Sequence, residues 1–205
     1  MMVAAAVALS TAASGSAVAQ SSSPRQAAPE KKAEAKRLVR PTKLDRTARL
    51  DGLFEALKRA PNAEIAHIVE EKIEAALLQS GSDTVDLLIG RARSMIEARD
   101  YDLSISLLDA LIELEPGFTE AFAQRATVYY LKKDVARSLA DLRIVLAREP
   151  RHYGSLAGLG VILQDIGEDK RALDAFRRAL AIHPNFKAIP ELVKKLEVKI
   201  EGREI

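Results

Sequence analysis

Three prolines recur at a constant interval in the second half of the chain: Pro116, Pro150 and Pro184 are spaced 34 residues apart. Each closes an apolar stretch of helical periodicity, because proline biases the residue before it away from helical angles. A fixed period of this kind is the mark of a repeat architecture. The interval therefore predicts three helical repeats, at residues 85–118, 119–152 and 153–186.

Further positions repeat in the same register. Large apolar residues recur at positions 4 and 11 of each unit, and small residues recur at positions 8 and 20. At helical spacing these residues form two stripes, separated each time by turn signals, and the small residues let two antiparallel helices approach closely. Each unit is therefore predicted to be a helical hairpin that buries its apolar face by stacking on a neighbour. The residues are Leu88, Phe122 and Leu156 (position 4), Ala92, Ala126 and Gly160 (position 8), Met95, Tyr129 and Leu163 (position 11), and Ser104, Ser138 and Ala172 (position 20).

This pattern resembles the tetratricopeptide repeat (TPR), and more broadly the chain resembles exported bacterial proteins that contain it. The repeat region as a whole is placed at 82–186. The third repeat fits best. The first two depart from the family pattern at position 7, where Arg91 and Arg125 replace the usual leucine, and at position 20, where both have serine. We expect these departures to weaken the single repeats without disturbing the register.

Additional helices are predicted on both sides of the repeats. Residues 42–81 read as a divergent helical hairpin, interrupted at Pro61 and ended at Gly81, which caps the first repeat. Residues 187–205 read as a C-terminal capping helix with Pro190 in its first turn; alternatively, this helix docks on a partner. The predicted fold is thus an all-α, TPR-like solenoid of helical hairpins with N- and C-terminal capping helices.

The first residues have the composition of a secretory signal. Residues 1–19 are apolar and rich in alanine and end in the small-x-small sequence Ala17-Val18-Ala19, but no Lys or Arg precedes the apolar run. Either the signal is atypical or translation starts upstream of Met1. The run is too short and weakly apolar for a membrane span. We expect a periplasmic or secreted protein. Alternatively, residues 1–19 form a disordered tail of a cytoplasmic protein.

A basic segment follows the predicted signal. Residues 20–41 are polar and predict a flexible linker. Residues 24–49 carry nine Lys or Arg against three Asp or Glu, although the whole chain has a net charge of only +2, so the remainder is mildly acidic. A repeat domain with a net negative charge is unsuited to binding nucleic acid. The segment itself suggests an alternative function, in which residues 24–49 tether the protein to anionic lipid or another polyanion.

The family resemblance implies a role in protein binding. In the family, the first helix of each repeat lines a concave groove, which suits a peptide or helix of a partner. The chain is therefore expected to be a scaffold or adaptor, with Tyr130 and Arg93 as the main contact residues. The carboxylate clamp of chaperone-binding members is not expected, because among the matching positions only Arg93 is cationic. The expected groove residues are Ile89, Arg93, Ile96, Ala123, Gln124, Thr127, Tyr130, Leu131, Ala157, Val161 and Gln164, with Glu120, Gly154, Gly158 and Asp165 also at groove-facing positions.

No arrangement of residues indicates catalysis. The chain has no cysteine, and His67, His152 and His183 lack the spacing of metal ligands. We place His67 on the polar side of a helix, and His152 and His183 at the surface beside the turns between repeats. No glycine-rich phosphate loop follows a strand. We therefore expect a protein that is not an enzyme and needs no cofactor or metal.

Overall fold

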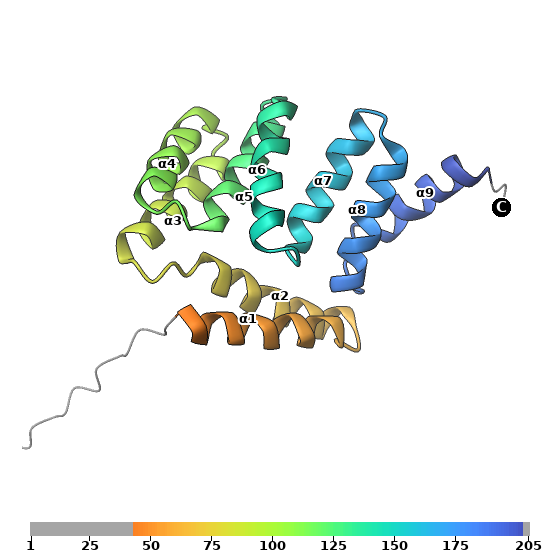
Figure 1. Ribbon diagram of the computed structural model, residues 1–205, viewed down its shortest axis with the longest axis horizontal. Coiled ribbons are helices and arrows are strands. Elements are labelled where there is room, and N and C mark those ends of the chain that lie inside the picture. Colours follow the sequence, from red (N-terminus) through yellow and green to blue (C-terminus); the bar gives the residue numbers. More distant parts are fainter. Residues whose placement is uncertain (1–42, 203–205) are drawn as a thin grey trace, which may run out of the picture. The chain divides into compact units, whose positions relative to one another are not determined.

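The computed structural model describes residues 43–202, and every regular element within that range is an α-helix (Figure 1). This agrees with the all-α fold that the sequence predicts. The predicted signal peptide (1–19) and linker (20–41) lie outside the described residues. All described helices belong to one compact unit. They are α1 (Lys43–Lys58), α2 (Ala63–Leu78), α3 (Asp83–Glu97), α4 (Tyr101–Leu114), α5 (Thr119–Leu131), α6 (Val135–Arg148), α7 (Tyr153–Asp165), α8 (Asp169–Ile182) and α9 (Pro190–Glu201).

Six of these helices form three successive hairpins, α3 with α4, α5 with α6, and α7 with α8. Pro116, Pro150 and Pro184 each stand directly after the residue that caps the second helix of a hairpin, so they occupy equivalent corners. The hairpins stack in chain order, because α4 packs on α5 and α6 packs on α7. The periodicity of the prolines therefore corresponds to a structural repeat.

Each hairpin turns at the same position of its repeat. Arg99, Lys133 and Gly167 have φ angles of 61°, 63° and 82°, in the left-handed region that residues with a side chain enter infrequently. In the first two repeats the next residue is an aspartate that caps the second helix. Asp100 accepts a hydrogen bond from the backbone N–H of Leu103, and Asp134 does the same for Arg137. The cap fixes the turn even where glycine is absent.

The small residues at positions 8 and 20 hold the two helices of a hairpin together. Ser104 Oγ donates a hydrogen bond to the carbonyl oxygen of Ala92 at 3.1 Å, and Ser138 Oγ donates to that of Ala126 at 2.8 Å. All four residues are buried. The serines at position 20 therefore satisfy their hydroxyl groups in the core, which explains how these repeats tolerate a departure from the family pattern.

In the third repeat, the two helices of the hairpin approach each other closely by a different contact. Gly160 faces the ring of Phe176, and a Cβ atom at Gly160 would lie 2.4 Å from the nearest ring carbon. The absence of a side chain thus admits a fully buried aromatic ring between α7 and α8. On the outer side of α8, helix α9 begins at Pro190 and buries Leu196, which closes this end of the apolar interior.

The hairpin of α1 and α2 forms, and its packing extends beyond the first repeat that it was expected to cap. The sequence suggested a cap stacked on the first repeat, whereas the buried cluster of this hairpin, which includes Leu57 and Ile73, has Tyr153 of α7 and Ile182 of α8 packed against it. Helix α1 contacts α8. Figure 1 shows α1 and α2 lying across the ends of the stacked hairpins. Apolar periodicity identifies which residues are buried but not which surface covers them.

Candidate protein-binding groove

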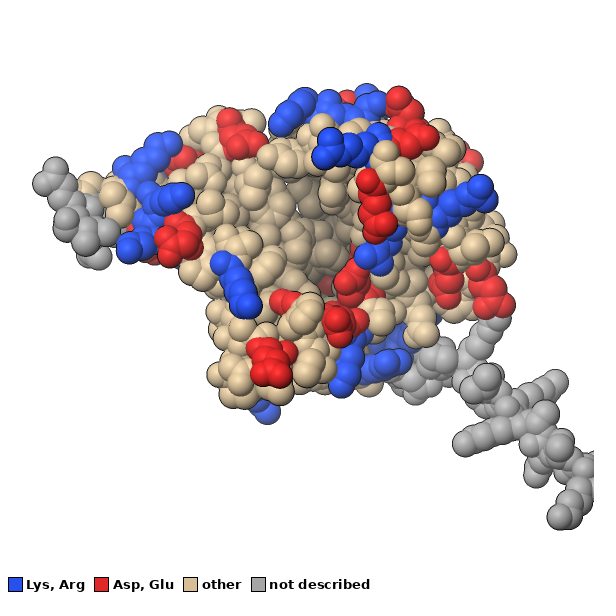
Figure 2. Space-filling model, turned by 180° about the vertical axis from the view of Figure 1, so that it is seen from behind, with Lys and Arg blue, Asp and Glu red and all other residues tan. Residues whose placement is uncertain are grey.

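The first helices of the hairpins lie side by side, since α5 contacts both α3 and α7. Between α5 and α7 is a hollow of about 310 Å³. Its walls are small or apolar over most of their extent. The face of the molecule seen in Figure 2 is hollowed, with an uncharged floor and charged side chains at the rim. The small and apolar lining residues are Ala123, Ala126, Leu142, Gly154, Gly158, Val161 and Ile162.

One end of the hollow carries a buried carboxylate. Glu120, at the start of α5, is only 7% exposed. Its Oε1 accepts a hydrogen bond from Gln124 Nε2 at 2.7 Å, and its Oε2 lies 3.3 Å from His152 Nε2. His152 caps α7, where its Nδ1 accepts a hydrogen bond from the backbone N–H of Ser155 at 3.0 Å. The local helix ends therefore position Glu120 and His152 against each other.

The other end of the hollow is formed by an aromatic side chain. Tyr130 lines it, and the phenol Oη donates a hydrogen bond to Asp165 Oδ2 at 2.7 Å. This hydrogen bond, with burial and the charge of Asp165, raises the pKa of Tyr130 above its usual value. The Lys133 Nζ lies over the ring, 5.4 Å from its centroid. Tyr130 is thus held in place by Asp165 at the end of α7 and by Lys133 in the turn after α5.

The hollow brings together five of the predicted groove residues, Ala123, Gln124, Thr127, Tyr130 and Val161. The predicted positions Glu120, Gly154 and Gly158 line it as well. The lining also includes Ser138 and Leu142 of α6, His152 and Ser155, which register alone did not indicate. His152 caps α7 by accepting from the backbone N–H of Ser155, and a cap at this position is a signal that could have placed both residues at the first turn of α7.

Two predicted groove residues belong instead to the core. Ile89 is 2% exposed and lies in the same buried cluster as Leu111, with Leu78 of α2 packed against that cluster. Ala157 is 8% exposed and belongs to the cluster around Phe176. Neither residue lines the hollow.

The remaining predicted residues lie outside the hollow. Ile96 is partly buried against the core of the first repeat, and Leu131 is exposed at the end of α5. Gln164 is partly exposed on α7. Arg93 forms an ion pair with Glu74 of α2, with 2.5 Å between Nη2 and Oε1. Arg93 therefore connects the first repeat to the N-terminal hairpin, and the structure does not bring it together with Tyr130.

The N-terminal hairpin makes polar contacts with the third repeat as well. His183 Nε2 is hydrogen-bonded to Glu70 of α2, and Asn185 Nδ2 donates to the carbonyl oxygen of Ala60 at 2.9 Å. His183 is fully buried, stacked on Phe186 and edge-on to Tyr153. We predicted His152 and His183 to be surface residues, and this was wrong for both, because both lie where segments distant in sequence meet.

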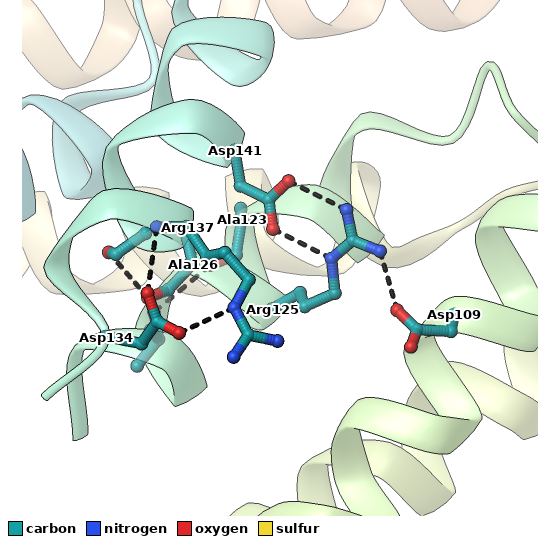
Figure 3. A network of polar contacts seen from close by, with 9 residues as sticks. Asp109, Ala123, Arg125, Ala126, Asp134, Arg137 and Asp141 are labelled. Atoms are coloured by element: carbon teal, nitrogen blue, oxygen red, sulfur yellow. Dashed lines mark hydrogen bonds and ion pairs between the residues drawn. The ribbon is translucent and has the colours of Figure 1, made fainter. Parts of the chain in front are cut away.

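Position 7 of the second repeat holds a partly buried ion-pair network. Arg125 donates two hydrogen bonds to Asp141 of α6, both at 2.8 Å, and one to Asp109 of α4 at 2.6 Å (Figure 3). The Asp141 side chain is 5% exposed. The hydrogen bonds to Asp141, opposed in part by burial, keep the pKa of Arg125 above its usual value. The network replaces the apolar contact usual at this position and joins two repeats, so its role is structural.

Comparison with known proteins agrees with this architecture. Over 154 residues, the chain is 35% identical to a TPR repeat-containing protein of Rhizobium etli, and the alignment covers 75% of this chain and 76% of that protein. The fold of this chain resembles the crystal structure of MamA, with a TM-score of 0.54 and 16% identity over 78% of this chain and 81% of MamA. It also resembles the first TPR of Spaghetti (RPAP3), bound to the HSP90 peptide SRMEEVD, with a TM-score of 0.54 and 16% identity over 57% of this chain and 93% of that one. No protein-family model matches the chain.

Stacked helical hairpins with a hollow along their first helices define a helical repeat protein of the solenoid class. The identity and coverage of the Rhizobium etli relative make the assignment more specific: the chain belongs to the tetratricopeptide-repeat family. Proteins of this family generally mediate protein–protein interactions and are typically non-enzymatic scaffolds. Among the residues that the structure describes, no helix is both long and apolar enough to cross a membrane.

Proposed function

We propose that this protein is a scaffold or adaptor that holds a segment of a partner protein in the hollow between α5 and α7. The observation that carries the proposal is the hollow itself, open to a guest, with apolar walls and polar groups at both ends. A peptide that enters such a site gains from burial of apolar side chains and from directed hydrogen bonds at the ends. The solved neighbour that holds an HSP90 peptide supports the same mode of use.

Gly158 offers a direct test. It lines the hollow at position 6 of the third repeat, and a Cβ atom there would meet nothing within 4 Å. Gly158→Leu therefore fills the hollow without disturbing the core. Gly90 occupies the same position of the first repeat, has the same free space, and lies outside the hollow, so Gly90→Leu is the matched control.

A photo-crosslinking residue at Thr127, which lines the hollow, reports on its occupant in cells. We expect crosslinks to a discrete set of proteins, lost in the Gly158→Leu background and retained in the Gly90→Leu background. The same residue at Ala147, an exposed position on α6, should not give these products. Crosslinks from Thr127 that persist unchanged with Gly158→Leu would contradict binding in the hollow.

We further propose that the protein acts in the bacterial envelope after removal of residues 1–19, on the basis of the signal-like composition of that segment. Intact-mass measurement of the protein from fractionated cells tests this. The expected product begins at Gln20 and occurs outside the cytoplasm. A cytoplasmic protein that retains residues 1–19 would refute export.

A further inference from the structure

We propose that the hollow between α5 and α7 selects a basic segment, and that a lysine or arginine side chain of the partner enters it and pairs with Glu120. The inference rests on the proposed function, since it specifies the chemistry of the segment that the hollow accepts. A basic segment differs from the peptide SRMEEVD bound to the solved RPAP3 neighbour, because three of the last four residues of that peptide are acidic.

The first support is the ionisation of the Glu120–His152 pair. His152 Nδ1 accepts a hydrogen bond from the backbone of Ser155, so this nitrogen carries no proton. The proton of the imidazole is therefore on Nε2, where it is donated to Glu120 Oε2. In this arrangement His152 is neutral, and so is the other donor, Gln124. Glu120 thus keeps a negative charge that neither of its hydrogen-bond donors compensates.

The second support is the balance of charge around the hollow. No Lys or Arg is among the described residues that line it. On the first helices of the first two repeats, Arg93 forms an ion pair with Glu74, and Arg125 forms ion pairs with two aspartates. Burial chiefly, and then the negative charges of Glu70, Glu74 and Glu120, raise the pKa of the nearby Tyr153 hydroxyl above its usual value. With Glu120 in the lining and no Lys or Arg beside it there, this end of the hollow favours a cation.

The third support is the shape of the walls. Besides Glu120, the hollow is lined by Ala123, Gly158 and Val161, which are small or aliphatic. Lysine and arginine side chains have an apolar stem and a charged end, so the stem covers apolar surface while the charged end reaches a carboxylate. A hydrogen bond between ionised groups in a partly dehydrated site is stronger than one between neutral groups. An acidic side chain would meet Glu120 without any cation to offset the repulsion.

An array of short peptides of varied sequence, probed with the full chain, tests the proposal. We expect Lys and Arg to be enriched over Asp and Glu among the peptides that bind, and the bound peptides to be lost with Gly158→Leu and kept with Gly90→Leu. Glu120→Gln should weaken the basic peptides by about tenfold or more, as removal of one ionised hydrogen-bond partner does. Glu113→Gln, on the exposed surface of α4, makes the same change in net charge and should leave binding unchanged.

The outcomes separate the two proposals. If peptides bind in a manner sensitive to Gly158→Leu but show no preference for Lys or Arg, or if Glu120→Gln leaves that preference intact, charge selection fails while groove binding stands. If no peptide is sensitive to Gly158→Leu, both fail. A thermal melt of Glu120→Gln close to that of the unmodified protein shows that any loss is one of binding. The glutamine amide oxygen can still accept from His152, and its NH2 group can donate to the amide oxygen of Gln124 once that amide turns over.

Discussion

Gly160 and Gly90 are both glycines within helices, and they differ in the space around them. A Cβ atom at Gly160 would overlap the ring of Phe176, whereas one at Gly90 would meet nothing within 4 Å. We expect Gly160→Ala to lower the free energy of unfolding by about 1–3 kcal/mol through overpacking. Gly90→Ala should raise it by about 0.5–1 kcal/mol, because alanine loses less backbone entropy in a helix. Urea denaturation of both variants checks this, and equal midpoints would mean that α7 and α8 separate easily.

Arg125 supports a second prediction at the scale of single residues. Arg125→Leu restores the residue usual at this position of the family but leaves the Asp141 carboxylate buried without its cation. We expect a loss of about 3 kcal/mol in unfolding free energy, as for other buried pairs that lose one partner. The double variant Arg125→Leu/Asp141→Leu should recover most of it, because an apolar pair of similar volume replaces the ions. Chemical denaturation of both variants measures the unfolding free energies. A double variant no more stable than Arg125→Leu would show that the unpaired Asp141 carboxylate does not cause the loss of stability.

The sequence identifies Arg125 as a departure from the repeat but does not identify its partners. Asp109 and Asp141 each lie 16 residues from Arg125, on either side along the chain. A cation at an apolar position indicates that a carboxylate must be near, since a buried charge is unfavourable without one. Which carboxylate fulfils this need depends on side-chain directions across three helices, and periodicity does not determine those directions.

At the scale of elements, helix α9 supports a prediction about the end of the stack. Leu196 is 1% exposed in the cluster that contains Phe176, while Val198 on the same helix is 37% exposed. Leu196→Ala should lower the unfolding free energy by about 2–4 kcal/mol, because it leaves a cavity, and Val198→Ala should change it little. Thermal and urea unfolding measure both. If Leu196→Ala reduces partner binding but not stability, α9 is a docking element and not a cap.

The elements themselves follow closely from the sequence, and the reason is local. Helix ends depend on prolines, caps and turn residues that recur every 34 residues, and stacking order follows from short connections between consecutive hairpins. The packing of α2 does not follow in the same way. Ile65 and Ile68 belong to its apolar pattern, yet they are 41% and 43% exposed, while Ala66 and Ile73 are buried. The hairpin's partner surface, on α7 and α8, is distant in sequence, and nothing in the pattern of α2 specifies it.

At the scale of the whole molecule, the N-terminal hairpin connects parts of the chain that the repeats alone would leave apart. Arg93 and Glu74 join it to the first repeat. Asp51 accepts a hydrogen bond from Arg151 at 2.7 Å, and the Arg151 guanidinium lies 4.6 Å from the ring centroid of Phe54. In a repeat protein each unit normally contacts only its neighbours. These long-range contacts should therefore make the unfolding of the first and third repeats more cooperative than in an open stack.

The contact between Glu70 and His183 makes part of this connection dependent on pH. Burial raises the pKa of the Glu70 carboxyl, but hydrogen bonds from His183 and His67 and their charges outweigh burial, so the pKa lies below its usual 4.5. A carboxyl with a lowered pKa in the folded state stabilises the fold above its unfolded-state pKa, and this contribution disappears as the pH falls through the folded-state value. Since Glu70 is 28% exposed, we expect on the order of 1 kcal/mol.

Glu70→Gln should therefore destabilise the protein at pH 6 to 7, and the difference from the unmodified protein should shrink as the pH falls below about 4.5. Glu71→Gln, a 67% exposed carboxylate on the same helix, is the control and should have little effect at any pH. Urea denaturation across this pH range gives the free energies, and hydrogen exchange shows where the loss occurs. Because Glu70 joins α2 to the corner after α8, faster exchange should appear in α1 and α2 before the repeats. Uniform exchange throughout the described helices, or a deficit that does not vary with pH, would mean that Glu70 does not hold the hairpin in place.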